Sequence, residues 1–208
     1  MISDPKLSAL INDISTIMSE NGPSHTSMDL LARRLHISKR TLYEIFGSKE
    51  DMIASVLVML RIKFTKRISN ALNTSENAME AMVRTIKIHQ DELKNTSTPM
   101  LRDLSNEDSP LRRNLEHIAE MVLHQLKHIH LIGIRQGVFR ESDDFDIQVR
   151  LLRVQMESLK RMEEFFPPGI TLPQAYRIIA HGFLRSLATP NGLIILENLI
   201  KEQPDINQ

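Results

Sequence analysis

Several side chains that can donate hydrogen bonds lie between residues 39 and 49. Lys39 and Arg40 carry positive charges, Thr41 and Tyr43 carry hydroxyls, and Lys49 follows shortly after them. Ammonium, guanidinium and hydroxyl groups bind the phosphate oxygens of nucleic acids, and in a DNA groove they also reach base edges. The chemistry that this stretch predicts is recognition of nucleic acid.

Two short helices joined by a tight turn are expected to position these donors. Thr26 and Asp29 have the spacing of a capping box, in which a hydroxyl and a carboxylate bind the free amides at a helix start. His36, Ile37 and Ser38 form the expected turn. The apolar face of the first helix consists of Leu30, Leu31 and Leu35.

The second helix is expected to begin after Ser38, which caps it, and to expose its donors. Lys39, Arg40, Thr41 and Tyr43 face outward in this arrangement, while Leu42, Ile45 and Phe46 face inward. Ser48 and Asp51 repeat the capping pattern and start a third helix with Lys49 in its first turn. A cation there opposes the helix dipole, and a bound phosphate would compensate for that cost.

The composition excludes several classes of protein. The 208 residues include no cysteine, which excludes disulfides and thiolate metal sites, and 41% hydrophobic residues suffice for a core. No signal-peptide core and no run approaching about eighteen apolar residues occur, so neither secretion nor membrane spanning is expected. A cytoplasmic location is the default expectation.

The formal net charge of zero conceals an uneven distribution. Residues 1–67 contain ten Lys or Arg and seven Asp or Glu, a balance of +3, and the remainder contains sixteen and nineteen, a balance of −3. This division is consistent with a DNA-contacting head on a neutral-to-acidic body. A difference of three charges also arises by chance, so it adds little weight by itself.

An apolar period of 3.6 residues runs through almost every segment and predicts an all-α protein. A helix-turn-helix head over residues 1–50 is expected to precede a helical-bundle body over residues 51–208. Outside the helix-turn-helix, the expected helices cover residues 5–21, 48–72, 76–94, 100–105, 110–136, 144–166, 172–188 and 191–202.

Eight histidines raise the question of a metal site. His124 and His128 are spaced i, i+4, and His117 lies near the same stripe. A metal needs three or four convergent ligands, and no Glu-x-x-His pair or zinc-hydrolase pattern accompanies these residues. The sequence also has no Gly-rich phosphate loop, Gly-x-Ser-x-Gly elbow or paired catalytic carboxylates. No metal, cofactor or enzymatic activity is therefore expected.

The residues from Thr41 to Glu50 resemble the TetR family of bacterial transcription regulators. The family's run Thr-Leu-Tyr-x-x-Phe-x-x-Lys-Glu is present as Thr41, Leu42, Tyr43, Phe46, Lys49 and Glu50, within a match over roughly residues 6–58. Gly137, Val138 and Phe139 are a second, weaker mark.

Two residues depart from the family pattern. His36 replaces the usual turn Gly and is tolerable, because His is enriched at positive φ. Glu44 stands where basic, polar or aromatic residues are commoner. It either accepts a hydrogen bond from cytosine or is solvated at the edge of the contact.

The resemblance implies a homodimer, a small-molecule pocket in the body and a double-stranded DNA operator. Six methionines of the body suit an adaptable pocket but also fill cores; they are Met79, Met82, Met100, Met121, Met156 and Met162. Two helices carry apolar stripes with small residues such as Ala175 beside them, and these helices are expected to form the dimer interface. The alternative is that both stripes pack into the body core. The candidate interface residues are Leu152, Met156, Leu159, Tyr176, Ile179, Gly182, Phe183 and Ser186.

The sequence thus predicts a regulator, expected to act as a repressor, whose DNA contacts come from the helix-turn-helix and whose effector changes the spacing of two heads. Lys39, Arg40, Tyr43 and Lys49 are expected on phosphates, and Thr41, with Arg40 and Glu44 as further candidates, on base edges. The full candidate set for DNA binding is Thr26, Ser27, Lys39, Arg40, Thr41, Tyr43 and Lys49. The alternative is a helical metal- or small-molecule-binding protein without a DNA function.

Overall fold

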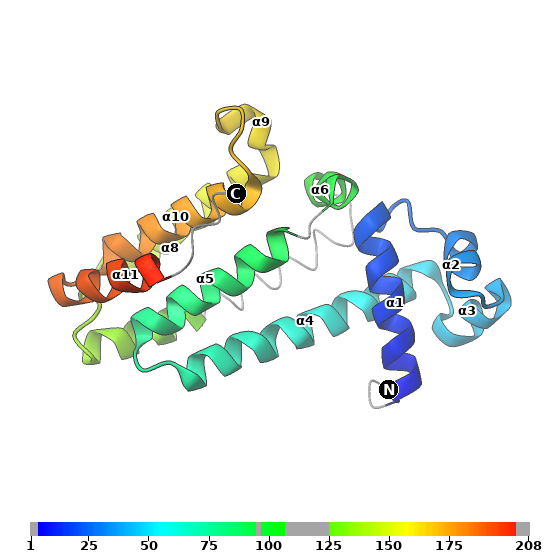
Figure 1. The fold of residues 1–208 in the computed structure, drawn as a ribbon, viewed down its shortest axis with the longest axis horizontal. Helices are drawn as coiled ribbons and strands as arrows, with labels where there is room; N and C mark the ends of the chain where they lie inside the picture. Colours follow the sequence, from blue (N-terminus) through cyan, green and yellow to red (C-terminus); the bar gives the residue numbers. More distant parts are fainter. Residues whose placement is uncertain (1–3, 95–96, 107–124, 203–208) are drawn as a thin grey trace. The chain divides into compact units, whose positions relative to one another are not determined.

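The computed structural model describes residues 4–94, 97–106 and 125–202, which fall into two compact units (Figure 1). The head unit holds the described residues up to Thr65 and those from 97 to 106. The body unit holds Lys66–Lys94 and residues 125–202. Within the described ranges every regular element is helical, apart from one isolated antiparallel bridge between Phe139 and Ala188. The all-α class is confirmed.

The head unit contains the predicted helix-turn-helix and one helix that comes from much later in the chain. Its core is formed by apolar faces of the first four helices, including the fully buried Ile14, Leu31, Leu42 and Val56. The elements are α1 (Pro5–Asn21), α2 (Met28–Leu35), α3 (Lys39–Phe46), the first part of α4 (Lys49–Thr74) and α6 (Thr98–Ser105).

Local sequence explains where α1 begins and ends. Asp4 caps its first turn by accepting a hydrogen bond from the Lys6 amide, and Pro5 occupies the first helical position, where no amide is needed. Gly22 ends the helix with φ of 78°. These bounds coincide with the expected helix over residues 5–21.

The body unit packs α5, α10 and α11 against one another, with α8 beside α10. Its core is centred on Met79, Val83, Phe139 and Leu184, all nearly inaccessible to solvent. Residues 125–135 form a further helix, and the rest of the expected helix over 110–136 lies outside the described residues. The named elements are the end of α4, α5 (Ala78–Lys94), α8 (Phe145–Ser158), η1 (Leu159–Arg161), α9 (Met162–Phe165), α10 (Leu172–Leu187) and α11 (Pro190–Glu202).

The helix expected over residues 144–166 is interrupted. A 3-10 turn, Leu159–Arg161, separates α8 from α9, and Arg161 has non-helical dihedral angles. No proline or glycine marks the break. The 3-10 turn contacts α10. Tertiary packing thus breaks a helix that the apolar period of the sequence predicts to continue to residue 166.

Gly137, Val138 and Phe139 form a structural junction in the body unit. Gly137 has φ of 70° and turns the chain, after which the Phe139 side chain is buried in the core. The Arg140 amide donates to the Leu187 carbonyl at 2.8 Å, and the Thr189 amide donates to the Val138 carbonyl at 3.1 Å. These bonds tie the turn to the end of α10 and the start of α11.

No helix in the described part of the chain has the length and apolarity needed to cross a membrane. The helix α4 begins in the head unit and ends in the body unit. A functional boundary between residues 50 and 51 stays a prediction.

We expect Gly192→Ala to destabilise the body unit by about 1 to 3 kcal/mol, the usual cost of overpacking. A methyl group at position 192 would overlap the backbone carbonyl of Val138, which cannot move without breaking its bond to Thr189. Urea unfolding measures the change, and Asn191→Ala, one position earlier and exposed, is the control. Equal midpoints for the two variants would contradict this close approach.

Candidate nucleic-acid interface

The orientation of α3 is fixed by one buried leucine and one capping serine. Leu42 has no exposed surface and lies in the head core. The Ser38 hydroxyl accepts the Thr41 amide at 3.0 Å, which satisfies a free donor at the helix start. The predicted cap is therefore present, and the side chains on either side of Leu42 are turned away from the core.

The turn between α2 and α3 contains the histidine that replaces the usual glycine. His36 adopts φ of 55° and ψ of 36°, the left-handed region, and its amide donates to the Ala32 carbonyl. It is the only non-glycine residue with positive φ in the described ranges. His36 thus ends the right-handed helix α2 with a C-cap residue in the left-handed region, as glycine usually does.

The start of α2 differs from the expected capping box. Ser27, not Thr26, is the cap, and its hydroxyl accepts the Leu30 amide at 3.1 Å. Thr26 is fully buried and donates its hydroxyl to the Gly22 carbonyl at 2.8 Å. This placement corrects the expectation for Thr26: its hydroxyl closes the preceding loop and is not exposed to a DNA backbone. Ser27 is exposed.

Lys39 is held by a carboxylate from the neighbouring helix. Its Nζ lies 2.8 Å from Asp29 Oδ2, and both side chains remain largely exposed. The hydrogen bond that Lys39 donates to Asp29, together with the negative charge of that carboxylate, raises the pKa of Lys39. The ammonium therefore stays charged, and a phosphate has to compete with Asp29 for it.

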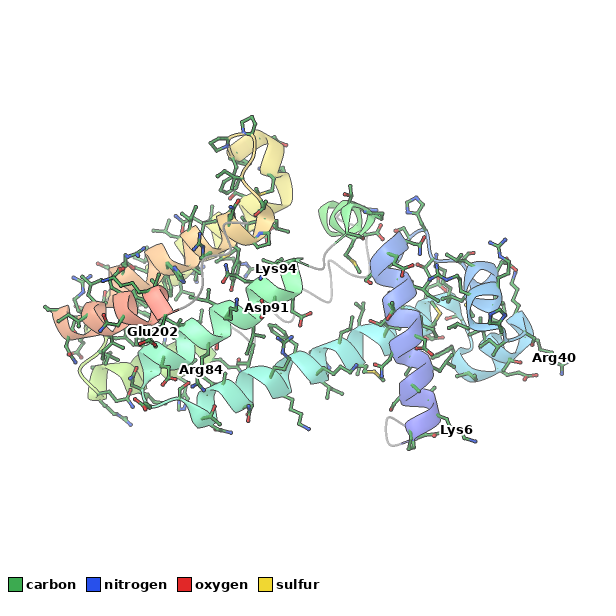
Figure 2. All side chains as sticks on the ribbon, viewed as in Figure 1. Lys6, Arg40, Arg84, Asp91, Lys94 and Glu202 are labelled. Carbon is green, nitrogen blue, oxygen red and sulfur yellow. The ribbon has the colours of Figure 1, made fainter. Side chains whose placement is uncertain are left out.

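Arg40 is the most exposed cation of α3, with 89% of its side chain accessible, and Figure 2 shows it extending away from the helix. Its Nε donates to Glu44 Oε1 at 2.8 Å, one helical turn later. An exposed pair of this kind contributes only about 0.3–0.5 kcal/mol. Four of the five guanidinium donors are left for other partners.

Thr41 and Tyr43 lie on either side of Leu42. The Thr41 hydroxyl is 2.8 Å from the Ser38 hydroxyl, so one of the two donates to the other. Tyr43 is 43% exposed. Ile45, expected to face inward, is 42% exposed, because the inward side of this short helix is already occupied by Leu42 and the partly buried Phe46.

Lys49 begins α4 and reaches back to the loop before α2. Its Nζ donates to the Ser24 carbonyl at 3.0 Å. The predicted cap of this helix is present, since the Ser48 hydroxyl accepts the Asp51 amide at 3.0 Å and donates to the Asp51 carboxylate at 2.6 Å. The ammonium has three donors, so two remain for a phosphate.

The residues expected at a dimer interface separate into two groups. Tyr176 stacks on His89 of α5 with ring centroids 5.6 Å apart, and Phe183 and Leu159 are buried. Leu152 and Met156 are partly buried against the body core, and Ile179 is half-buried. Only Gly182 and Ser186 are exposed.

A different set of apolar side chains is exposed on the same helices. Ile147, Leu151 and Val154 occupy one outward stripe of α8, and Ile178 is 61% exposed on α10. Most residues of the apolar stripes that the sequence predicts for an interface, on α8 and α10, pack into the core of the body instead. The most exposed apolar side chains of these helices thus lie outside the expected set, and the expected interface residues stay a prediction.

His89 of α5 stacks on Tyr176 of α10. Its burial there lowers its pKa to about 4, so this imidazole is neutral at physiological pH.

The metal site considered for the histidines can be examined only in part. No group of three or more potential metal ligands occurs among the residues that the structure describes. His117 and His124 lie outside these residues, and His128 is exposed.

Comparisons with known proteins place the helix-turn-helix in a known family. The family model described as bacterial regulatory proteins, tetR family, matches residues 12–56, which include α2, α3 and the start of α4. Among curated proteins no sequence matches this chain.

Solved structures of regulators share the fold. A TetR family regulator, PfmR from Thermus thermophilus, is 26% identical, with 85% of this chain and 97% of that chain covered and a TM-score of 0.55. A transcriptional regulator from Cytophaga hutchinsonii is 18% identical, with 89% and 100% covered and a TM-score of 0.69.

A transcriptional regulator from Saccharomonospora viridis in complex with choline is 16% identical, with 89% and 100% covered and a TM-score of 0.70. The match to the family model falls on the capped helix pair whose geometry is described above. The helix-turn-helix segment of this chain is therefore similar to the TetR family of bacterial regulatory proteins, and the chain as a whole shares the fold of solved transcription regulators.

Proposed function

We propose that this protein is a homodimeric transcription regulator that binds a two-part DNA operator and is released from it by a small molecule. The observation that carries the proposal is the capped helix α3, which buries Leu42 and presents Arg40, Thr41 and Tyr43. Laid in the major groove, such a helix brings its N-terminal residues to base edges. The proposed site of action is the cytoplasm, where a bacterial chromosome lies.

The proposed contacts divide by chemistry. Lys39, Arg40, Tyr43, Lys49 and the exposed Ser27 bind phosphates and hold the head in register. Thr41, early on α3, meets a base edge, and Arg40 is a second candidate for this role. The Arg40–Glu44 pair favours a role for Glu44 in holding Arg40 over direct contact with a cytosine.

A second copy of the chain is the proposed partner of the exposed apolar faces of α8 and α10. Ile147, Leu151 and Val154 follow i, i+4, i+7 spacing, and α8 packs beside α10. On α10, a methyl group at Gly182 would meet no atom within 4 Å beyond its chain neighbours and the backbone of its own helix. Open space over a helix-interior glycine allows a neighbouring backbone to approach closely, which supports a twofold helix packing.

The proposed effector binds the body. One similar structure holds choline, another, a regulator from Bacillus subtilis, holds stearoyl-CoA, and a third is a ketosteroid regulator from Mycobacterium tuberculosis. These different chemistries leave the effector of this chain open. Any effector shifts the DNA-binding equilibrium only by its differential affinity for the two conformations.

Lys49→Ala is expected to weaken binding about equally on all duplexes and to reduce the slope of log affinity against log salt by roughly one unit, because one phosphate contact is lost. Fluorescence anisotropy of labelled duplexes over a salt series measures this slope. Lys201→Ala, which removes an exposed cation from α11, is the control and should match the wild type.

The wild-type titration also separates the proposed function from its alternative. A ligand- or metal-binding protein without a DNA function would show no salt-dependent duplex binding. An unchanged slope in Lys49→Ala, with altered sequence preference only, would move Lys49 from the phosphates to the bases.

Thr41→Ala is expected to change preference at one or two operator positions by about 1 to 3 kcal/mol per lost base contact at most. The helix cap survives, because Ser38 accepts the backbone amide of residue 41 and not its side chain. Competition with duplexes substituted one base pair at a time measures the change. A uniform loss over all of them would assign Thr41 to a phosphate.

Gly182→Leu is expected to break the dimer and abolish tight operator binding while leaving each chain folded. The added side chain enters open space in one chain but would separate two helices packed across a twofold axis. Sedimentation at micromolar concentration and circular dichroism measure the two effects. Asn198→Leu, at an exposed position of α11, is the control. A dimer as tight as that of the wild type would place the interface elsewhere.

A further inference from the structure

The helix α6 holds the loop between α1 and α2 through a buried carboxylate. Asp103 is only 4% exposed, and its Oδ2 accepts the Ser24 amide at 2.8 Å, across 79 positions of sequence. The Ser97 hydroxyl, just before α6, donates to the Ser19 carbonyl at the end of α1. Met100, expected in the body, packs instead against the head core. Polar and apolar contacts together hold α6 against the other helices of the head unit.

Gly22 makes this close approach possible. A methyl group there would lie 2.9 Å from Asp103 Oδ2 and 3.0 Å from the Pro99 carbonyl oxygen, and φ of 78° is itself unfavourable for other residues. The glycine therefore serves the contact with α6 as well as ending α1.

Ser24 connects this carboxylate to the expected phosphate-binding cation. Its amide donates to Asp103, and its carbonyl accepts a hydrogen bond from Lys49 Nζ at 3.0 Å. Hydrogen bonds to charged groups are roughly twice as strong as neutral ones. The backbone of this exposed loop residue is thus held from both sides, by an anion of α6 and a cation of α4.

We infer that Asp103 is a positioning residue for the DNA contact of Lys49. It restrains Ser24, the Ser24 carbonyl restrains the Lys49 ammonium, and the two remaining donors of that ammonium are held ready for a phosphate. A long lysine side chain loses rotamer freedom on binding, and ordering it beforehand lowers that cost. The inference rests on the proposed function, and it makes α6 part of the DNA-binding apparatus.

A double-mutant cycle on the full-length protein tests this role. Asp103→Ala is expected to weaken duplex binding about two- to tenfold, the range for ordering one flexible side chain. In a Lys49→Ala background the same substitution should have no further effect, because the positioned group is gone. A carboxylate that only stabilises the head would weaken binding equally in both backgrounds.

Asp103→Asn keeps an acceptor without the charge and provides the second variant. Its loss of affinity should be smaller than that of Asp103→Ala and should also vanish in the Lys49→Ala background. Circular dichroism checks that each variant is folded, and if Asp103→Ala is not, the cycle with Asp103→Asn decides. If the losses of affinity persist in the Lys49→Ala background, or if neither Asp103 variant loses affinity, the inference is wrong. Duplex binding by the wild-type protein would still support the proposed function in that case. Absence of wild-type binding overturns both.

Discussion

The burial of Leu42 is the constraint on which the candidate interface depends. An eight-residue helix has too little intrinsic stability to hold itself in place, so its contact with the head core sets its orientation. With Leu42 inside, Arg40, Thr41 and Tyr43 cannot also face the core. The cap from Ser38 and the left-handed turn at His36 then fix where the helix starts. The apolar packing of Leu42 therefore determines which side chains of α3 are available to contact DNA.

The cations of the interface are held by protein partners before any DNA arrives. Lys39 binds Asp29, Arg40 binds Glu44, and Lys49 binds the Ser24 carbonyl. Each partner orders a flexible side chain, and each carboxylate also competes with phosphate. Such an arrangement disfavours nonspecific association and favours a site where all contacts form at once.

Local signals predicted most of the head. The caps at Ser38 and Ser48, the bounds of α1 and the outward donors of α3 follow from short-range rules that operate within a few residues. Thr26 shows where such rules become ambiguous, because two adjacent hydroxyl residues both fit a cap, and the structure uses Ser27. The Asp103–Ser24 bond, which joins residues 79 positions apart, has no local sequence signal.

The body was predicted less completely, for a related reason. Apolar period identifies a buried face but not which partner buries it. Tyr176 and Phe183 therefore looked available for a second chain, although they pack against α5 and the body core. The 3-10 turn at residues 159–161 likewise depends on contact with α10, which a periodic pattern does not contain.

Selection of binding sites from a random duplex library by the full-length protein tests whether α3 recognises a DNA sequence and whether two heads bind together. We expect one enriched motif with twofold symmetry, whose half-sites are centred about one helical turn of DNA, or a multiple of it, apart. Recovery of duplexes without a common sequence would contradict sequence-specific recognition by α3. An enriched single half-site would contradict the paired heads.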